Sequence, residues 1–127
     1  YYEDYEESEL KNFYDVFNTE HPNIKRIRNK ISKLFLTDSE NSKIFMSIQD
    51  VYPINSKRIN FKGNSSVESV GLWKLSDISA GGPFNSIIIY DSNKKRVYYL
   101  EGYVYAPGSK KRNLMQEISS ILMTFEI

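Results

Sequence analysis

The order of apolar and polar positions along the chain predicts helices near both ends and a sheet between them. Over residues 8–20, apolar side chains recur at spacings of three and four, which is typical of one buried helix face. Pro22 disfavours helix in the residue before it but is tolerated in a first turn, so a second amphipathic helix is expected from Pro22 to about Phe35. A third apolar stripe predicts a final helix, capped by Ser109 or a neighbour. That stripe consists of Leu114, Ile118, Ile121, Leu122 and Phe125.

The middle of the chain follows a different pattern, with apolar side chains at alternate positions as in half-buried strands. The expected strands are Lys43–Tyr52, Lys57–Phe61, Val67–Leu75, Phe84–Tyr90 and Arg96–Tyr105. A short connection such as Asp91–Lys95 makes the strands that it joins antiparallel. Helices that cover one face of an antiparallel sheet of four to five strands form a two-layer α+β sandwich, which is the predicted fold class. The pattern leaves open which face of the sheet is buried.

The length of 127 residues indicates one domain, because a chain of this size can bury a core without disulfides or metals. Residues 1–7 are acidic and contain three tyrosines. We expect them to be a flexible end or linker, so the domain is assigned to residues 8–127.

The net charge of +1 is distributed unevenly along the chain. Residues 1–20 carry seven acidic side chains and one lysine, whereas the remaining 107 residues carry 16 basic and nine acidic side chains. The basic residues cluster at expected turns and on the polar side of expected helices, where solvated positions account for them. No nucleic-acid partner is therefore predicted.

The sequence offers little for catalysis or metal binding. It has no Cys and a single His, His21, next to Pro22 at an expected helix junction, where a capping or surface role is the simpler interpretation. No serine lies in a Gly-x-Ser-x-Gly elbow, and no pair of acids has the spacing of metal ligands. We therefore expect a protein that is not an enzyme and that needs no cofactor or metal.

Aromatic side chains and one acid gather on the last expected strand. Tyr99, Glu101, Tyr103 and Tyr105 alternate along it and so share a face. Glu101 has two open interpretations: a buried acid of functional interest, or a member of a sheet face open to water. Aromatic platforms suit peptides and glycans, although cross-strand packing of tyrosines explains the same pattern. Together with Trp73, these residues form the candidate binding site.

The run Gly81-Gly82-Pro83-Phe84 is the most distinctive local feature. A glycine pair can let backbone amides cradle an anion, but phosphate sites place such a loop before a helix. Here the loop comes before an expected strand. A tight turn or bulge is therefore the favoured interpretation.

Four ordered motifs in the C-terminal half resemble a known family. They are Gly71-Leu72-Trp73-Lys74, Gly81-Gly82-Pro83-Phe84, Arg96-Val97 with Leu100-Glu101-Gly102-Tyr103-Val104-Tyr105-Ala106-Pro107, and Lys111-Arg112-Asn113-Leu114-Met115. Together they resemble the closing segment of the domain of unknown function 4837, a family of uncharacterised lipoproteins of Bacteroidota. The resemblance extends from about Ile31 to Ile127. It implies that Trp73 anchors the core, that residues 81–83 and 106–107 are turns, and that Gly102 marks a strand kink or a close approach.

The same resemblance implies where the protein acts. Because family members have an N-terminal signal and a lipid-bearing Cys, this chain is expected to be the C-terminal domain of a longer outer-membrane lipoprotein that faces the periplasm. Membrane association is then expected only through that lipid, and the family offers no activity to carry over.

Two hypotheses for the function follow. The leading one is a non-enzymatic module of the cell envelope that binds another envelope protein, or the N-terminal part of its own chain. In it, an edge strand around Lys57–Phe61 accepts a partner strand. The alternative is a domain that binds a small ligand, a glycan or a peptide through the Tyr-rich sheet face.

Overall fold

The structure is a computed structural model of the chain, and the residues that it describes are 2–6, 44–45, 55–75, 81–105 and 111–127. These ranges hold six strands and one helix. In chain order the elements are β1 (Tyr2–Asp4), β2 (Ile44–Phe45), β3 (Asn55–Phe61), β4 (Asn64–Leu75), β5 (Gly81–Asp91), β6 (Arg96–Tyr103) and α3 (Arg112–Met123).

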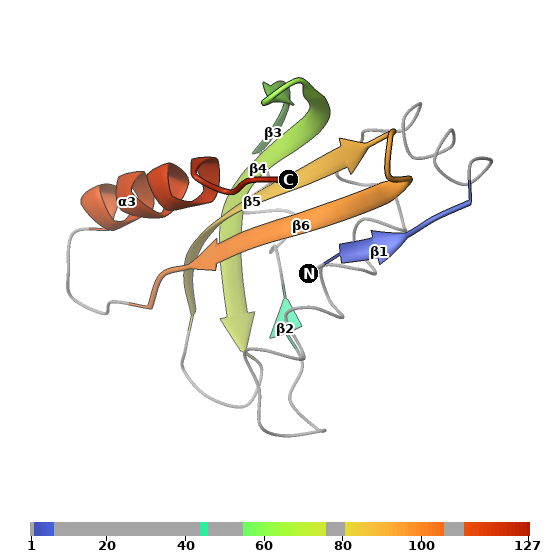
Figure 1. The fold of residues 1–127 in the computed structure, drawn as a ribbon. Helices are drawn as coiled ribbons and strands as arrows, with labels where there is room; N and C mark the ends of the chain where they lie inside the picture. Colours follow the sequence, from blue (N-terminus) through green and yellow to red (C-terminus); the bar gives the residue numbers. More distant parts are fainter. Residues whose placement is uncertain (1, 7–43, 46–54, 76–80, 106–110) are drawn as a thin grey trace.

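All strands join one antiparallel sheet in the order β1-β6-β5-β4-β2, and β3 also pairs with β4 (Figure 1). The long strands β4, β5 and β6 form its centre. β1 lies at one edge, whereas β2 and β3 share the other edge, each along a different part of β4. The expected antiparallel sheet and C-terminal helix are thus confirmed, but the sheet has one strand more than predicted.

Several expected elements lie outside the described residues. These are the helices over 8–20 and 22–35, most of the strand Lys43–Tyr52, the cap Ser109 and the turn at residues 106–107. Of the strand, Ile44–Phe45 is described and forms β2. The final helix begins at Arg112, with Lys111 at the N-cap position.

A two-residue turn joins β3 to β4. Lys62 and Gly63 have φ values of +49° and +89°, and such a pair of positive angles defines the type I′ turn that matches strand twist. The Asn60 side chain supports the turn by accepting a hydrogen bond from the Gly63 amide at 2.8 Å. Since two residues suffice to reverse the chain, β4 already begins at Asn64, three residues before the expected start of that strand at Val67.

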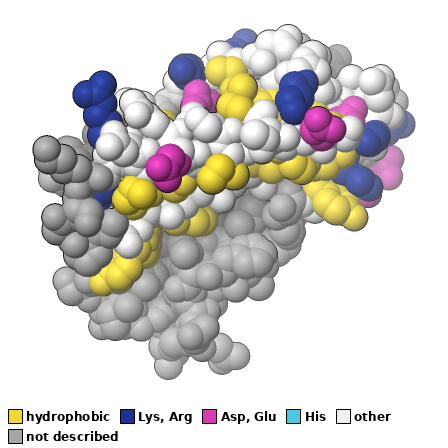
Figure 2. All heavy atoms as spheres, turned by 60° about the vertical axis from the view of Figure 1, so that its left-hand side comes forward, with side chains coloured by type: hydrophobic (Ala, Val, Ile, Leu, Met, Phe, Trp, Pro, Cys, Tyr) yellow, Lys and Arg dark blue, Asp and Glu magenta, His cyan; other side chains and the backbone are white. Residues whose placement is uncertain are grey.

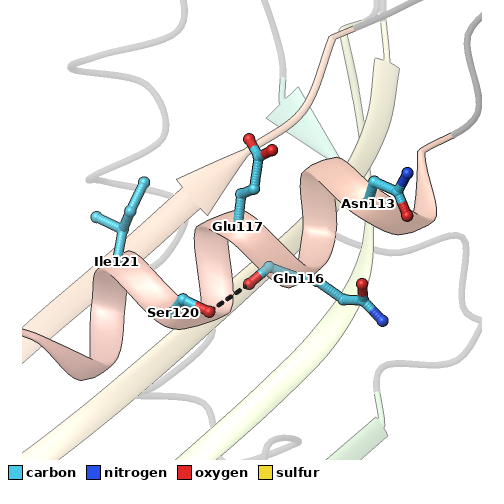
Figure 3. Close-up of a pocket in the computed structure, with 5 residues that line it drawn as sticks. All are labelled: Asn113, Gln116, Glu117, Ser120 and Ile121. Atoms are coloured by element: carbon cyan, nitrogen blue, oxygen red, sulfur yellow. Dashed lines mark hydrogen bonds between the residues drawn. The ribbon is translucent and has the colours of Figure 1, made fainter.

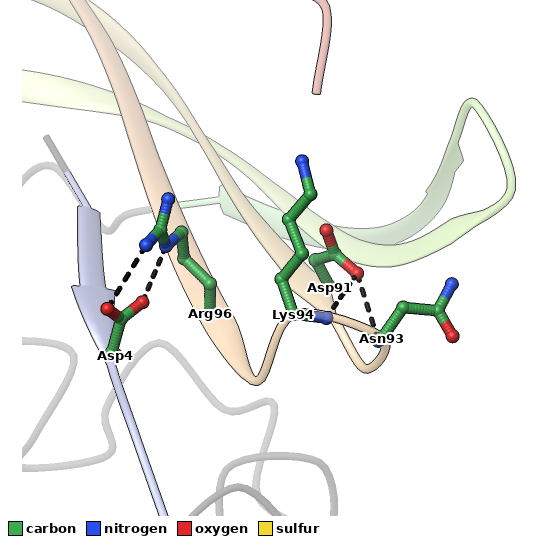
Figure 4. A network of polar contacts seen from close by, with 5 residues as sticks. All are labelled: Asp4, Asp91, Asn93, Lys94 and Arg96. Carbon is green, nitrogen blue, oxygen red and sulfur yellow. Dashed lines mark hydrogen bonds and ion pairs between the residues drawn. The ribbon is translucent and has the colours of Figure 1, made fainter.

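The turn between β5 and β6 has the chemistry that the sequence predicts. One carboxylate oxygen of Asp91 accepts hydrogen bonds from the backbone amides of Asn93 (3.0 Å) and Lys94 (3.2 Å), as Figure 4 shows. Lys95 completes the reversal with a positive φ of 52°. Because these hydrogen bonds form within the turn itself, the hairpin can be predicted from its local sequence alone.

The helix α3 covers one face of the sheet over β5 and β6 (Figure 1). Ile118 approaches the sheet so closely that a Cβ at Gly102 would lie 2.2 Å from its Cγ2 atom, which confirms the close approach expected at this glycine. At the end of the helix, the Lys62 ammonium donates a hydrogen bond to the Phe125 carbonyl at 2.7 Å. The core beneath this region consists of Phe61, Ile87, Ile89 and Tyr98, packed against Ile59, Leu100, Leu122 and Phe125.

The opposite face of the sheet has a second core. Ile88, Val97 and Tyr99 are buried there, and the partly buried Tyr5 and Tyr90 pack against them. Every residue from Phe84 to Ile89 on β5 is buried, so this central strand is enclosed on both faces. Both faces of the sheet are therefore buried along β5, and this settles a point that the sequence pattern leaves open.

The acidic end of the chain differs from the expected linker, because Tyr2–Asp4 forms the edge strand β1. Asp4 lies opposite Arg96, and their side chains form a salt bridge with 2.5 Å between Oδ1 and Nε (Figure 4). The guanidinium of Arg96 also lies over the Tyr2 ring, 4.0 Å from its centroid. A charge pair and a cation–π contact thus hold a short polar segment on the sheet.

We expect Asp4→Asn to loosen β1 at neutral pH and to have no effect well below pH 3.8. The hydrogen bond from Arg96 lowers the pKa of Asp4 below its ordinary value of 3.8. A carboxyl with a lowered folded-state pKa stabilises the fold above its unfolded-state pKa, and this contribution disappears as pH falls through the folded-state pKa. Hydrogen exchange of the β1 amides in both proteins, at neutral and at acidic pH, measures the effect. A loss of the same size at both pH values would contradict a role for the charge.

Candidate functional site

Trp73 anchors the end of the sheet where β4, β5 and β6 meet. Its side chain is buried, and its indole N–H donates to the Val104 carbonyl at 3.2 Å. Gly82 lies opposite Trp73 in the register, and a Cβ at Gly82 would come within 2.0 Å of that same carbonyl oxygen. Val104 is fixed from the other side, since its amide donates to the Pro83 carbonyl at 2.9 Å. The implied role of Trp73 as a core anchor is confirmed.

The turn expected over Gly81–Pro83 is wrong, because these residues lie within β5. The physical reason is the backbone after β6, which crosses Gly82 at a distance that leaves no room for a side chain. A glycine needed for such a crossing has the same appearance in the sequence as a turn glycine. No anion cradle forms from this part of β5, since its residues are paired with β4.

Two of the predicted site residues pack against Trp73, which is itself a predicted site residue, and Glu101 joins them. The Tyr103 ring packs edge-on against Trp73 at 6.2 Å between centroids, and the Tyr105 ring lies at 6.3 Å. The Tyr103 hydroxyl donates a hydrogen bond to the Glu101 carboxylate. Glu101 and Tyr103 are half-buried, whereas Tyr105 is 59% exposed. We call these four residues the aromatic corner.

Tyr99, the fifth predicted site residue, belongs to a different cluster. Its side chain is buried, and its hydroxyl lies 3.2 Å from the hydroxyl of Tyr5. Tyr5 in turn donates to the Glu3 carboxylate at 2.5 Å. Tyr99 therefore helps to hold the segment after β1 against the sheet and presents no surface to a ligand.

A row of serines, which no local sequence pattern indicates, crosses the sheet on the face that carries Tyr99. Ser56, Ser69, Ser86 and Glu101 lie directly opposite one another on β3, β4, β5 and β6. Ser69 and Ser86 are fully buried; the Ser56 and Ser69 hydroxyls are 2.7 Å apart, and the Ser86 hydroxyl has no hydrogen-bond partner. Such an unpaired buried hydroxyl costs about 1–3 kcal/mol. The row could be found only from the register, since its members are spread over 45 residues of sequence.

The strand β3 is largely exposed. Four consecutive residues, 55–58, are exposed, and so is Asn60. On the helix-covered face, Lys57 forms a salt bridge to Glu68 (3.2 Å), and Glu68 also accepts a hydrogen bond from the Asn85 amide group at 3.2 Å. Within the described ranges, β3 pairs with β4 on one side and with no strand on the other.

The outer side of α3 carries a shallow depression, shown in Figure 3, whose lining is mostly uncharged. Ser120 turns its hydroxyl back to the helix and donates to the Gln116 carbonyl at 2.9 Å. Glu117 is the single titratable group in the lining, and Ile121 is 66% exposed beside it. In Figure 2 apolar side chains form a band across the described part of the face shown, and charged side chains of both signs lie scattered beside it. This depression has no grouping of side chains that indicates a particular chemistry.

Among the described residues there is no cluster of three or more His, Asp or Glu side chains placed to hold a metal ion. The described part of the chain also lacks a helix of the length and apolar character needed to cross a membrane. The features that remain as candidates for function are the aromatic corner and the open edge β3.

The arrangement defines a small domain built on an open antiparallel sheet with a C-terminal helix. The family model of the domain of unknown function DUF4837 matches residues 8–124, so the chain belongs to this family. Comparisons with curated proteins and with solved structures gave no match.

Proposed function

We propose that this protein is a non-enzymatic binding module of the cell envelope that takes an extended segment of a partner protein onto the edge strand β3. The envelope location, in a lipoprotein that faces the periplasm, is supported by the resemblance of the sequence motifs to envelope lipoproteins of Bacteroidota. The partner is another envelope protein or a further part of the same protein. Strand addition is supported by the geometry of β3.

The single observation that carries strand addition is the exposed outer side of β3. The two-residue turn makes Phe61 and Asn64 the first hydrogen-bonded pair of the hairpin, and such pairs alternate along an antiparallel ladder. The backbone N–H and C=O groups of Ser56, Arg58 and Asn60 consequently point away from β4. A row of outward-pointing backbone groups is the template that an added strand uses.

We expect Ser56→Pro to abolish binding of the partner without unfolding the domain. Proline removes an N–H that points away from β4, so the ladder with β4 stays intact while one bond to an added strand is lost. Ser56→Ala is the matched control, because it keeps the N–H and removes the same hydroxyl contact with Ser69.

The measurement is capture from envelope extracts by the immobilised wild-type protein and the two variants, followed by hydrogen exchange of the β3 amides in the captured complex. Binding to the wild-type protein and to Ser56→Ala, lost with Ser56→Pro, supports strand addition. Equal capture by all three proteins, with unprotected amides at Arg58 and Asn60, would rule it out.

A second candidate function is binding of a small ligand, a glycan or a short peptide at the aromatic corner. The observation in its favour is Tyr105, an exposed aromatic ring beside Trp73. Stacking on such a ring suits sugars and peptides. A thermal-shift screen tests this function, since a ligand at 100 times its Kd adds about 2.7 kcal/mol of stability. A shift that Tyr105→Ala does not reduce would exclude the aromatic corner as the site.

A further inference from the structure

The edge of the sheet at β6 already holds one short strand, β1, through contacts that another segment can copy. We infer that a segment of another protein replaces β1 on this edge. Its pattern is an aromatic residue, any residue, an aspartate and a second aromatic residue. The inference goes beyond the proposed function, because it concerns the edge opposite β3 and a different set of contacts.

One face of β1 is recognised by Arg96. Its guanidinium donates two hydrogen bonds to the Asp4 carboxylate, from Nε at 2.5 Å and from Nη2 at 3.1 Å (Figure 4). The same guanidinium lies 4.0 Å from the centroid of the Tyr2 ring, and that ring is tilted against Tyr98 at 6.2 Å between centroids. A two-pronged bond of this kind fits the planar shape of a carboxylate. This face therefore selects an aromatic residue and, two positions later, an aspartate.

Tyr5, directly after β1, is recognised by its backbone and by its ring. Its amide donates to the Lys95 carbonyl at 3.0 Å, which extends the contact with the β6 edge beyond β1. Its side chain packs against the buried core that contains Tyr99, and the two hydroxyls lie 3.2 Å apart. The second aromatic residue of the pattern corresponds to Tyr5. The pattern thus has contacts on both faces of the sheet.

β1 is held on the sheet by few residues, and most of them are exposed. The described register joins Tyr2–Asp4 to Arg96–Tyr98, which is three pairs. Tyr2 is 54% exposed, and so is 59% of the Asp4 side chain. A strand that buries so little surface opens at low cost in free energy. Once β1 has opened, its contact surface on β6 is available to any segment with the same anchors.

A second copy of the chain is a weaker candidate for this edge. Before two copies can exchange β1, each has to release its own strand, so two openings precede the first new contact. The exchanged pairs then restore the contacts that both copies gave up and add none. A segment that is not yet paired needs one opening only. This difference favours a partner from another protein.

Competition between β1 and the partner leads to a reciprocal expectation. The apparent Kd of the partner equals its Kd for the open edge divided by the fraction of chains in which the edge is open. Asp4→Asn weakens β1 and so raises that fraction, whereas the same replacement in the partner removes the partner's own bond to Arg96. One substitution therefore tightens binding when it is in the chain and weakens binding when it is in the partner.

The test uses the full chain labelled for NMR and an unlabelled peptide with the sequence of residues 2–6, blocked at both ends. We expect Asn in place of the peptide's Asp to weaken binding about two- to five-fold, and Asp4→Asn in the chain to tighten it by a similar factor. Glu117→Gln is the matched control, because it removes one negative charge from the outer side of α3. Arg96→Glu is expected to transfer the preference to a peptide with Lys in place of Asp.

Release of β1 can be measured at its own amides. Bonded pairs alternate along an antiparallel ladder, so Glu3 and Val97 form the bonded pair next to the contact between Tyr5 and Lys95. Bound peptide should expose the amides of Glu3 and Tyr5 to exchange, while the Val97 amide stays protected by the peptide.

The outcomes separate this inference from the proposed function. Peptide binding that leaves the Glu3 and Tyr5 amides protected would overturn the inference, as would equal effects of Asp4→Asn and Glu117→Gln. Peptide contacts confined to β3 would overturn it too, but would support strand addition there. A dimer that forms without peptide and is lost in Asp4→Asn would assign the edge to a second copy and exclude the partner from another protein. None of these results replaces the test of β3 with Ser56→Pro.

Discussion

Replacing Gly82 with alanine is expected to destabilise the domain by about 3 kcal/mol or more. The new Cβ would lie 2.0 Å from the Val104 carbonyl oxygen, so the chain after β6 has to move away from β5. That movement also breaks the hydrogen bond from the Trp73 indole, which ends on the same oxygen at 3.2 Å. Urea unfolding followed by Trp73 fluorescence measures both the loss of stability and the altered environment of the indole.

Gly102→Ala is the informative comparison, because its clash is with a side chain. A Cβ there would meet Cγ2 of Ile118 at 2.2 Å, and Ile118→Ala removes that atom. We expect the double variant Gly102→Ala, Ile118→Ala to cost less than the sum of its parts, whereas no side-chain truncation rescues Gly82→Ala. A free energy of unfolding within about 1 kcal/mol of wild type for Gly82→Ala would show that the crossing tolerates a methyl group.

Phe61→Ala is expected to cost about 3–5 kcal/mol, the largest effect among single core truncations on the helix-covered face. Phe61 is fully buried at the end of β3 and belongs to the core against which Leu122 and Phe125 pack. The cavity would lie directly below the end of α3, so loss of packing there is expected to release the helix as well. Chemical unfolding measured by the far-UV signal of the helix and by Trp73 fluorescence follows the two parts separately.

Phe61→Leu serves as the control, because it keeps most of the volume and is expected to cost less than about 1.5 kcal/mol. The two unfolding signals should stay superimposed in this variant, while in Phe61→Ala the helix signal should change at lower urea. Superimposed transitions with a small shift in Phe61→Ala would mean that α3 is held mainly by Ile118 over Gly102.

Local patterns predicted the strands and the final helix well, because each is determined by neighbouring residues. The alternation along β4 and β6 and the Asp91 turn are features of this kind. The predictions that failed share one cause, since the structural features concerned depend on partners far away in the sequence. β1 exists because Arg96 lies opposite Asp4, 92 positions away, and no local pattern identifies that pair. Gly82 was assigned to a turn for the same reason, since its requirement comes from Val104.

The candidate site followed the same rule. Alternation correctly placed Tyr99, Glu101 and Tyr103 on one face of β6, yet it could not separate Tyr99, which is buried with Tyr5, from the aromatic corner. The serine row was invisible because it runs across four strands, and only the register brings Ser56 and Glu101 into line. The edge strand was the feature predicted from the sequence, around Lys57–Phe61, and it corresponds to β3.

The pairing of β1 has a consequence for the order in which the molecule folds. The hairpins β3–β4 and β5–β6 close over turns of two and four residues, so they can form early and at little cost in chain entropy. β1 joins a strand 92 residues further along the chain, and only three paired residues offset the entropy cost of closing that long loop. We expect it to dock last and to detach first, so that the sheet passes through a state with two open edges each time it folds.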